Sequence, residues 1–246
     1  MRNPTFLKAN WRNIIMANYP IPAAAVQQYL PRGVELDLWE GQAYVSLVGF
    51  LFENTKLFGV PIPFLGTFEE VNLRLYVVRH TGNEVRRGVV FINETVPYAP
   101  VAWMANKLYK EHYTAVKTKY SLHANDTALQ VHYQWQAGGR WNTIGATVAA
   151  AVAPMVPNSF EEFIFEHYYG YTRINASLTE EYTIAHPSWR IHQLNEARID
   201  CDFAAVYGPD FAILNHVEPT DVFMAEGSAV AVKWKRHQLH PHDLTR

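Results

Sequence analysis

The chain has 246 residues, 49% of them hydrophobic and 18% charged, which is enough to bury a large core, and we expect one domain over residues 1–246. A net charge of −2 excludes the broad basic field that draws proteins to nucleic acid or anionic lipid, so neither is a predicted partner. Cys201 is the only cysteine, so no intrachain disulfide can form and a cytoplasmic location is expected. The Ala-rich run over residues 144–156 is too short to cross a bilayer, and no membrane association is predicted.

Strands dominate the predicted elements in the first half of the chain. Aromatic residues make up 14% of the sequence, which favours strands over long helices. Hydrophobic patterning predicts strands over residues 11–18, 35–37, 42–52, 68–77 and 88–95. The second and third of these are expected to pair around a turn at Glu40-Gly41, and residues 53–66 are predicted to form a loop. Helices are predicted over residues 23–29 and 97–109, each with a proline near its start.

The second half of the chain continues the same pattern. Strands are predicted over residues 110–122, 128–136, 141–153, 181–185, 193–200 and 228–237. Ser159 and Glu162 have the spacing of a capping box, so we expect a helix that begins there and ends near Tyr169. A short helix is expected near residues 203–207. With no linker or internal repeat in the sequence, the elements predict a mostly-β single domain.

The strand over residues 68–77 carries the most informative pattern. Because side chains alternate between the two faces of a strand, five of its residues share one face. These are Phe68, Glu70, Asn72, Arg74 and Tyr76, opposite an apolar face of Val71, Leu73, Leu75 and Val77. An acid, an amide and a guanidinium in a row would form a polar wall for a small ligand if this face looks into a barrel or cleft. If the face looks into water, the strand is an ordinary amphipathic strand of an antiparallel sheet.

The sequence contains no recognisable motif for a cofactor or a metal. Glycine-rich phosphate loops, the nucleophile elbow of hydrolases and paired cysteines are missing, so we predict no cofactor. His237, His240 and His242 cluster in a polar segment near the C-terminus, which does not offer the rigid, partly buried frame that a metal ion needs. His186 and His192 are interpreted as parts of a structural cap. The prediction is therefore that no metal is bound.

Five sequence segments together resemble the uncharacterised YqjF-like family. They are residues 31–37 (PRGVELD), 41–45 (GQAYV), 68–77 (FEEVNLRLYV), 171–173 (YTR) and 186–189 (HPSW). The resemblance covers nearly the whole chain. The family is similar in fold to acetoacetate decarboxylase, so the resemblance implies a closed or nearly closed antiparallel β-barrel with short helices around an internal cavity.

The resemblance also allows a residue-by-residue comparison with the decarboxylase site. Arg12 matches an arginine of the first strand that faces the substrate carboxylate, and Glu70 matches a glutamate that enters a central strand. The segment that carries two lysines in the decarboxylase is here residues 111–113 (EHY), so both lysines are absent. In the decarboxylase one of these lysines forms an imine with the substrate, and the charge of the other lowers its pKa. Imine-forming catalysis is therefore not expected here unless Lys110 or Lys117 reaches the cavity from a shifted register.

Two functions remain open at this point. In the first, the barrel binds a small carboxylate, with Arg12 or Arg74 as its anchor and Asn72 and Tyr76 as further contacts. Glu70, His112 and Tyr113 are then the candidate acid–base groups. In the second, the protein is a non-catalytic structural or interaction protein in which Glu70 and Arg74 pair with each other and fix the strand register. The aromatic surplus is also compatible with a self-association surface, and hence with a homo-oligomer.

Overall fold

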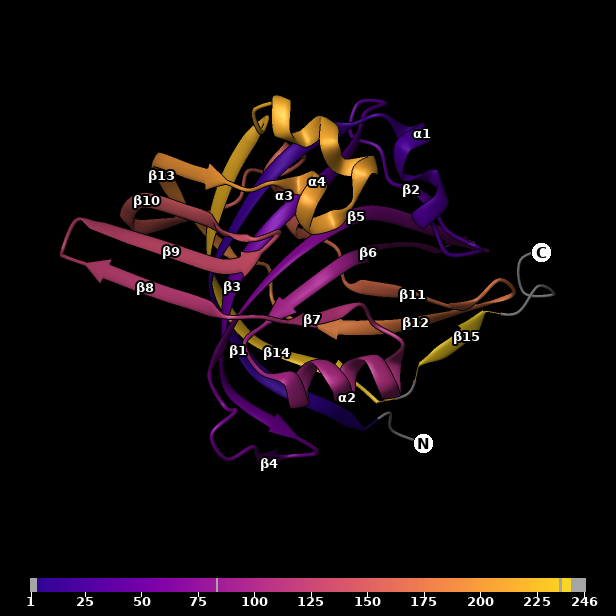
Figure 1. Ribbon diagram of the computed structural model, residues 1–246. Coiled ribbons are helices and arrows are strands. Elements are labelled where there is room, and N and C mark those ends of the chain that lie inside the picture. Colours follow the sequence, from indigo (N-terminus) through magenta and orange to yellow (C-terminus); the bar gives the residue numbers. More distant parts are fainter. Residues whose placement is uncertain (1–3, 83, 235, 240–246) are drawn as a thin grey trace.

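The computed structural model describes residues 4–82, 84–234 and 236–239, which form a mostly-β fold (Figure 1). The long strands of its first half are β1 (Thr5–Ile21), β3 (Ala43–Leu57), β5 (Phe68–Thr81) and β6 (Glu84–Val96). Those of its second half are β8 (Thr118–Ala124), β9 (Ala128–Ala137), β10 (Arg140–Pro154), β11 (Tyr169–Asn175), β12 (Leu178–Ala185), β13 (Arg190–Asp200) and β14 (Asp221–Lys233). Short strands are β2 (Glu35–Leu36), β4 (Val60–Pro61), β7 (Tyr113–Ala115) and β15 (His237–Leu239).

The helices are few and short. They are α1 (Ala23–Val26), α2 (Ala99–Tyr109), α3 (Phe160–Phe165) and α4 (Phe203–Tyr207), with 3₁₀ turns η1 (Gln27–Tyr29) and η2 (Pro209–His216). The helices predicted over residues 23–29, 97–109 and 203–207 are therefore confirmed. None of the helices in the described part of the chain is long and apolar enough to cross a membrane.

Seven strands pair in a ring, which confirms the expected barrel-like arrangement. The order is β14, β1, β3, β5, β6, β11 and β12, and β12 returns to β14 through the pairs Ile184↔Val232 and Ala185↔Ala231. Every neighbouring pair in this ring is antiparallel except β6 and β11, which run parallel. At that junction a Cβ on Gly88 would lie 2.6 Å from the carbonyl oxygen of Tyr169, so only glycine allows the two strands to approach.

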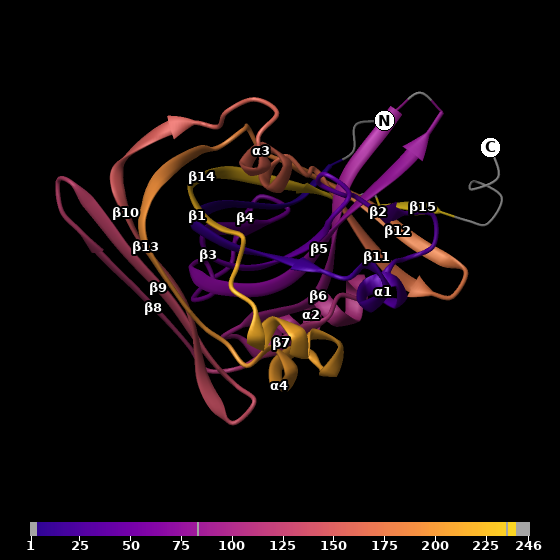
Figure 2. The ribbon, with the colours of Figure 1, turned by 90° about the horizontal axis from the view of Figure 1, so that it is seen from above.

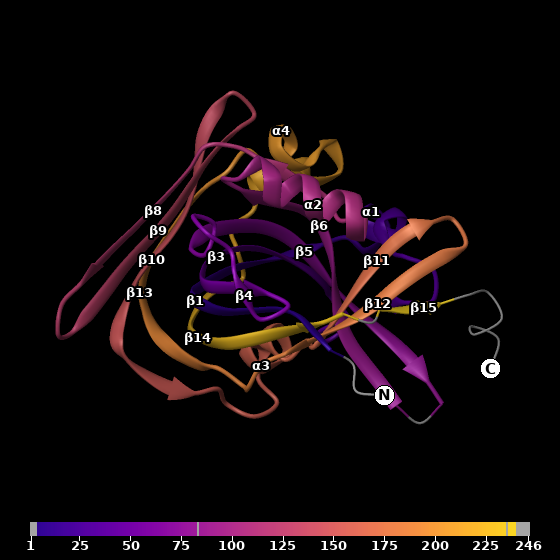
Figure 3. The ribbon, with the colours of Figure 1, turned by 90° about the horizontal axis from the view of Figure 1, so that it is seen from below.

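A second layer lies outside the ring. Strands β13, β10, β9 and β8 continue the sheet from β14 and form a separate layer at one side of the barrel strands (Figures 2 and 3). Tyr133 and Ile144 of this layer pack where Gly49 of β3 has no side chain, since a Cβ there would lie 2.7 and 2.9 Å from them. The apolar side chains consequently form two cores, one between the layers and one inside the ring.

The structure corrects two predicted strand arrangements. Strand β2 pairs with β5 and not with β3, because residues 37–42 form only the isolated bridge Trp39↔Gln42. The strand predicted over residues 110–122 is split into β7 and β8, and β7 runs parallel to β6. The split changes which residues of this segment face the barrel interior, as described below.

The helix that begins after Ser159 is shorter than predicted. The Ser159 hydroxyl accepts a hydrogen bond from the Glu162 backbone N–H at 3.2 Å, as expected for the cap. The Glu162 carboxylate accepts from the backbone of Asn158 rather than from Ser159. The helix ends at Phe165, and strand β11, which the sequence pattern did not predict, begins at Tyr169 and pairs with both β6 and β12.

Candidate functional site

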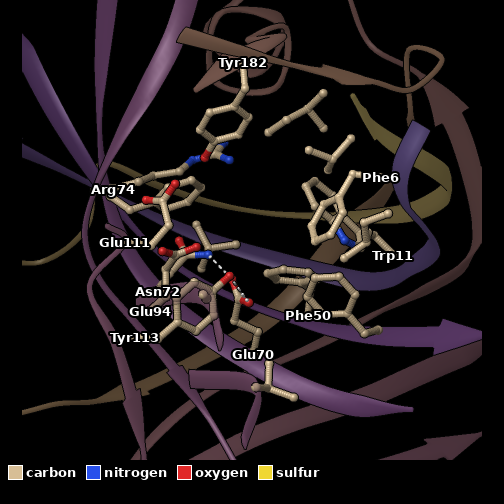
Figure 4. A pocket seen from close by; sticks show the side chains of 18 of the residues that line it. Phe6, Trp11, Phe50, Glu70, Asn72, Arg74, Glu94, Glu111, Tyr113 and Tyr182 are labelled. Carbon is tan, nitrogen blue, oxygen red and sulfur yellow. Dashed lines mark hydrogen bonds between the residues drawn. The ribbon is translucent and has the colours of Figure 1, made fainter. Parts of the chain in front are cut away.

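The interior of the ring contains a cavity of about 140 Å³. Most of its wall is apolar and comes from β1, β3, β5, β6, β12, β14 and α2. The phenylalanines and tryptophans of this wall are Phe6, Trp11, Phe50, Phe52, Phe68, Phe91 and Trp189. Polar side chains gather opposite three of these rings, Phe6, Trp11 and Phe50 (Figure 4). The cavity therefore has an aromatic side and a polar side.

Strand β5 supplies the centre of the polar side. Glu70, Asn72 and Arg74 line the cavity, and Glu70 and Asn72 are only 3% and 2% exposed. Residues of the opposite strand face, such as Leu73 and Leu75, are buried in the core between the two layers. The polar face of the strand therefore looks into the barrel and not into water, which decides between the two possibilities left open by the sequence.

Glu70 is held by two hydrogen bonds inside the cavity. Its carboxylate accepts from the Asn72 amide at 3.0 Å and from the Tyr113 hydroxyl at 3.2 Å. Burial raises the pKa of Glu70 to about 7, against the effect of these two bonds and with a further contribution from the charge of Glu111. A carboxyl with this pKa can gain or lose a proton near neutral pH.

Two further glutamates, which the sequence did not single out, face the same cavity. Glu94 of β6 is 4% exposed, and its Oε2 has no hydrogen-bond partner among the described residues. Burial, followed by repulsion from Glu70 and Glu111, raises the pKa of Glu94 well above its usual range. Glu111 accepts from Thr172 at 2.9 Å and from Arg236 at 3.1 Å, yet burial still raises its pKa.

A register irregularity explains why Glu94 was missed. In the pairing of β5 with β6, Leu73 lies opposite Asn93 whereas Arg74 lies opposite Phe91, so Ile92 is an extra residue. Such a bulge places Phe91 and Glu94, three positions apart, on the cavity side together. Strict alternation would have put them on opposite faces.

Arg74 carries a positive charge into the cavity. Its guanidinium donates to the backbone carbonyl of Ile164 at 3.2 Å and contacts Met16 Sδ at 3.4 Å. No carboxylate of the described chain lies within ion-pair distance of it, and its buried Nε has no partner. The internal Glu70–Arg74 pair expected under the structural hypothesis is therefore not formed.

Tyr76 ends the polar row outside the cavity. It is 1% exposed, and its hydroxyl lies 2.6 Å from the Ser46 hydroxyl. Its ring packs against Phe163 and His167, and it is not among the residues that line the cavity. The structure places Tyr76 with the supporting residues rather than in contact with the cavity.

Arg12 and His112 also lie outside the cavity, which corrects their expected placement. Asn13 has a φ of 52° and forms a bulge, across which the register between β1 and β3 shifts. Trp11 and Ile14 therefore line the cavity, whereas the side chain of Arg12 is 42% exposed and lies 3.8 Å from Glu53. His112 is exposed because Glu111 and Tyr113, on either side of it, point inward.

The lysine that reaches the cavity is neither of the two that the sequence suggested. Lys110 and Lys117 are exposed and do not line it. Lys233, near the end of β14, does line it, and its Nζ lies 3.4 Å from the Thr5 hydroxyl. No sequence signal marked Lys233, because only closure of the ring brings β14 beside β1 and β12.

The histidines show no metal-binding arrangement within the described residues. No group of three His, Cys, Asp or Glu side chains in that part of the chain is placed to hold a metal ion. His186 stacks on Trp189 with ring centroids 4.1 Å apart, and His192 Nδ1 lies 2.9 Å from the carbonyl oxygen of Ala149. His240 and His242 lie outside the described residues.

Solved structures with the same fold come from the acetoacetate decarboxylase-like group. The chain matches an acetoacetate decarboxylase-like enzyme from Sphingomonas wittichii with a TM-score of 0.65 and 10% identity, over 98% of this chain and 94% of that one. It matches the enduracididine biosynthesis enzyme MppR, solved with pyruvate, with a TM-score of 0.64 and 12% identity, over 98% of this chain and 93% of that one. The match to acetoacetate decarboxylase from Legionella pneumophila has a TM-score of 0.60 and 12% identity, over 96% of this chain and 91% of that one. At such identities the likeness shows the fold.

Sequence relatives place the chain among proteins whose function is not known. It is 32% identical to the uncharacterized protein YqjF of Bacillus subtilis over 72 residues, which is 29% of this chain and 30% of that protein. The match thus spans less than a third of the relative's length. Residues 8–229 match the model of the DUF2071 family, described as an uncharacterized conserved protein. Because this match covers most of the sequence, the chain belongs to the DUF2071 family.

Proposed function

We propose that the barrel cavity binds a small organic carboxylate and that Glu70 exchanges a proton with it. One observation carries this proposal: Arg74 and Glu70 lie on one strand face of the same cavity, the first without a carboxylate partner and the second with a pKa raised to about 7. A cation without a carboxylate partner and a titratable acid are the groups that an acid–base site for a carboxylate needs.

Binding would use both sides of the cavity. The guanidinium of Arg74 is suited to a carboxylate, because its planar fork can donate two parallel hydrogen bonds. The aromatic side would cover the apolar part of the ligand. The similarly folded enzyme MppR has been solved with pyruvate, a small carboxylate, which supports this class of ligand.

Proton transfer would depend on Glu70 and its two hydrogen-bond partners. Asn72 orients the carboxyl by donating to one oxygen, and Tyr113 donates to the other. A carboxyl whose pKa lies close to neutral can act as acid or as base at physiological pH. His112 has no part in this proposal because it is exposed.

A thermal-shift screen of small carboxylates and keto acids, pyruvate included, tests the binding step. A ligand at about a hundred times its Kd stabilises the folded state by roughly 2.7 kcal/mol, which gives a shift of a few degrees. Arg74→Met should abolish the shift, and Arg12→Met, the same change at the surface arginine, should retain it. A shift that survives Arg74→Met, or is lost only in Arg12→Met, would remove Arg74 from the site.

The proposed chemistry does not pass through an imine. Lys233 is the lysine of the cavity wall, and no second lysine accompanies it there among the residues that line the cavity. Borohydride reduction in the presence of pyruvate should therefore leave the protein mass unchanged. A stoichiometric adduct that disappears in Lys233→Met would replace the acid–base proposal with imine catalysis.

A further inference from the structure

Of the three carboxyl groups on the polar side of the cavity, only one has an ion-pair partner among the described residues. Glu70, Glu94 and Glu111 all face it. Glu111 pairs with Arg236, but within the described part of the chain no ion pair under 4 Å involves Glu70 or Glu94. Buried carboxyls are ordinarily paired or hydrogen-bonded, because burial of a charge is costly. Glu70 and Glu94 are therefore buried in the cavity without an ion pair among the described residues.

Two buried acceptor atoms in this region have no hydrogen-bond partner. One is Oε2 of Glu94, and the other is Oδ1 of Asn72, a residue that is 2% exposed. The amide of Asn72 is oriented by its donation to Glu70, which leaves Oδ1 as the free end. Asn72 and Glu94 lie directly opposite each other in the pairing of β5 with β6. Two unpaired acceptors on neighbouring strands indicate a missing donor.

The missing donor fits an organic cation better than a metal ion. Glu70, Glu94 and Glu111 are not placed to hold a metal, since no suitable group of three ligands is found in the described residues. A protonated amine has three N–H donors and one positive charge, so it can donate to both acceptors and form an ion pair with Glu94. Repulsion from Glu70 and Glu111 helps to raise the pKa of Glu94, and an ammonium group would counteract that repulsion.

The position of Arg74 then defines the rest of the ligand. Arg74 lies two residues beyond Asn72 on β5, which is about 7 Å along a strand. A single small molecule can therefore meet Arg74 with a carboxylate and Asn72 and Glu94 with an ammonium group. The aromatic side of the cavity faces these groups (Figure 4).

We propose that the ligand of this cavity is a small amino acid with an apolar side chain, whose ammonium group is held by Glu94 and Asn72. The inference rests on the proposed function, which supplies Arg74 as the carboxylate anchor. The cavity of about 140 Å³ limits the side chain to a small apolar body. A cavity of about 150 Å³ lined by apolar side chains is known to hold benzene, which sets the scale.

Three matched probes test the inference by calorimetry on the full chain. Leucine carries both charged groups, 4-methylpentanoate lacks the amine, and 3-methylbutylamine lacks the carboxylate. We expect leucine to bind at least tenfold more tightly than either of the others. Glu94→Gln should remove the advantage of leucine over 4-methylpentanoate. Glu53→Gln, the same change at a surface glutamate, should preserve the advantage.

The outcomes separate this inference from the proposed function. If 4-methylpentanoate binds as tightly as leucine, the amino-acid inference is overturned and carboxylate binding stands. If none of the three binds, the inference is overturned, and the thermal-shift screen of other carboxylates decides the proposed function by itself. A leucine advantage that persists in Glu94→Gln also overturns it. Comparison of the three probes on the unaltered protein remains decisive even if a variant fails to fold.

Discussion

The protein buries carboxyl groups in two regions, which differ in whether the chain supplies an ion-pair partner. Glu181 of β12 lies between two arginines, with Arg79 at 3.0 Å and Arg86 at 2.5 Å, and it also accepts from the Tyr171 hydroxyl at 3.0 Å. In the cavity, Glu70 and Glu94 are equally buried but have no ion pair within 4 Å among the residues described. The first region is compensated within the chain and the second is not.

This difference separates structural from functional burial. The arginines that hold Glu181 come from β5 and β6, so the cluster joins β12 to two strands of the ring that lie beyond β11. Such a cluster can hold the strands in register, the role that the structural hypothesis assigns to Glu70 and Arg74. The cavity groups are left with unmet hydrogen-bonding capacity, which a ligand can satisfy. Buried charge therefore points to a candidate site only where the chain itself does not neutralise it.

Glu181→Gln should give the largest loss of stability. The change leaves Arg79 buried without its charge partner, and breaking such a pair typically costs about 3–5 kcal/mol. Glu94→Gln, the same change in the cavity, should not lower the free energy of unfolding at pH 8, because Glu94 has no charge partner to lose and burial raises its pKa, so the change removes the cost of ionising it. Urea unfolding measures both. Equal losses in the two variants would contradict the distinction between the regions.

The second-largest effect should be a pH dependence of stability that comes from Glu70 in the cavity. Burial raises the pKa of Glu70 from 4.5 to about 7, so the folded protein keeps a proton that the unfolded chain releases. The associated stability is present below pH 4.5 and is lost as the pH rises to about 7. Glu70→Gln should therefore gain stability relative to the parent protein between pH 4.5 and 7. The gain should be at most about 3 kcal/mol, since one pKa unit corresponds to about 1.4 kcal/mol.

His167 provides the control of opposite sign for this measurement. Burial lowers its pKa from 6.5 to about 4, although a hydrogen bond to Asp37 acts against the shift. The associated stability is present above pH 6.5 and is lost as the pH falls to about 4. The parent protein therefore loses this stability as the pH falls, whereas His167→Gln does not, so the difference in the free energy of unfolding between the two should shrink. Unfolding at several pH values measures this difference. A flat difference for Glu70→Gln would mean that Glu70 is not protonated in the folded protein at neutral pH.

Tyr76→Phe should have the smallest effect on stability and tests whether the binding site extends beyond the residues that line the cavity. It removes a buried hydroxyl that bonds to Ser46, which typically costs about 1 kcal/mol. Because Tyr76 does not line the cavity, the affinity for any carboxylate found in the screen should change less than twofold. Tyr113→Phe is the comparison, since its hydroxyl donates to Glu70 inside the cavity. If Tyr76→Phe weakens binding as much as Tyr113→Phe does, the site extends beyond the cavity wall.

The sequence alone determined the mostly-β class and the central polar row of the site. Both follow from local periodicity, which the alternation of Glu70, Asn72 and Arg74 with Leu73 and Leu75 makes explicit. The resemblance to the YqjF-like family added the expectation of a decarboxylase-like barrel, which the solved structures support as a fold. Helices with a clear start, such as α2, were also readable, since proline at the first turn is a local signal.

Only the tertiary structure decided which other side chains join that row. The bulge at Asn13 places both Trp11 and Ile14 on the cavity side and leaves Arg12 outside, and the bulge near Ile92 brings Glu94 to the cavity. A single extra residue reverses the face of every side chain that follows it, and strand pairing, not local sequence, fixes where it is placed. Lys233 reaches the cavity only because β14 closes the ring, a contact between segments that are far apart in the chain.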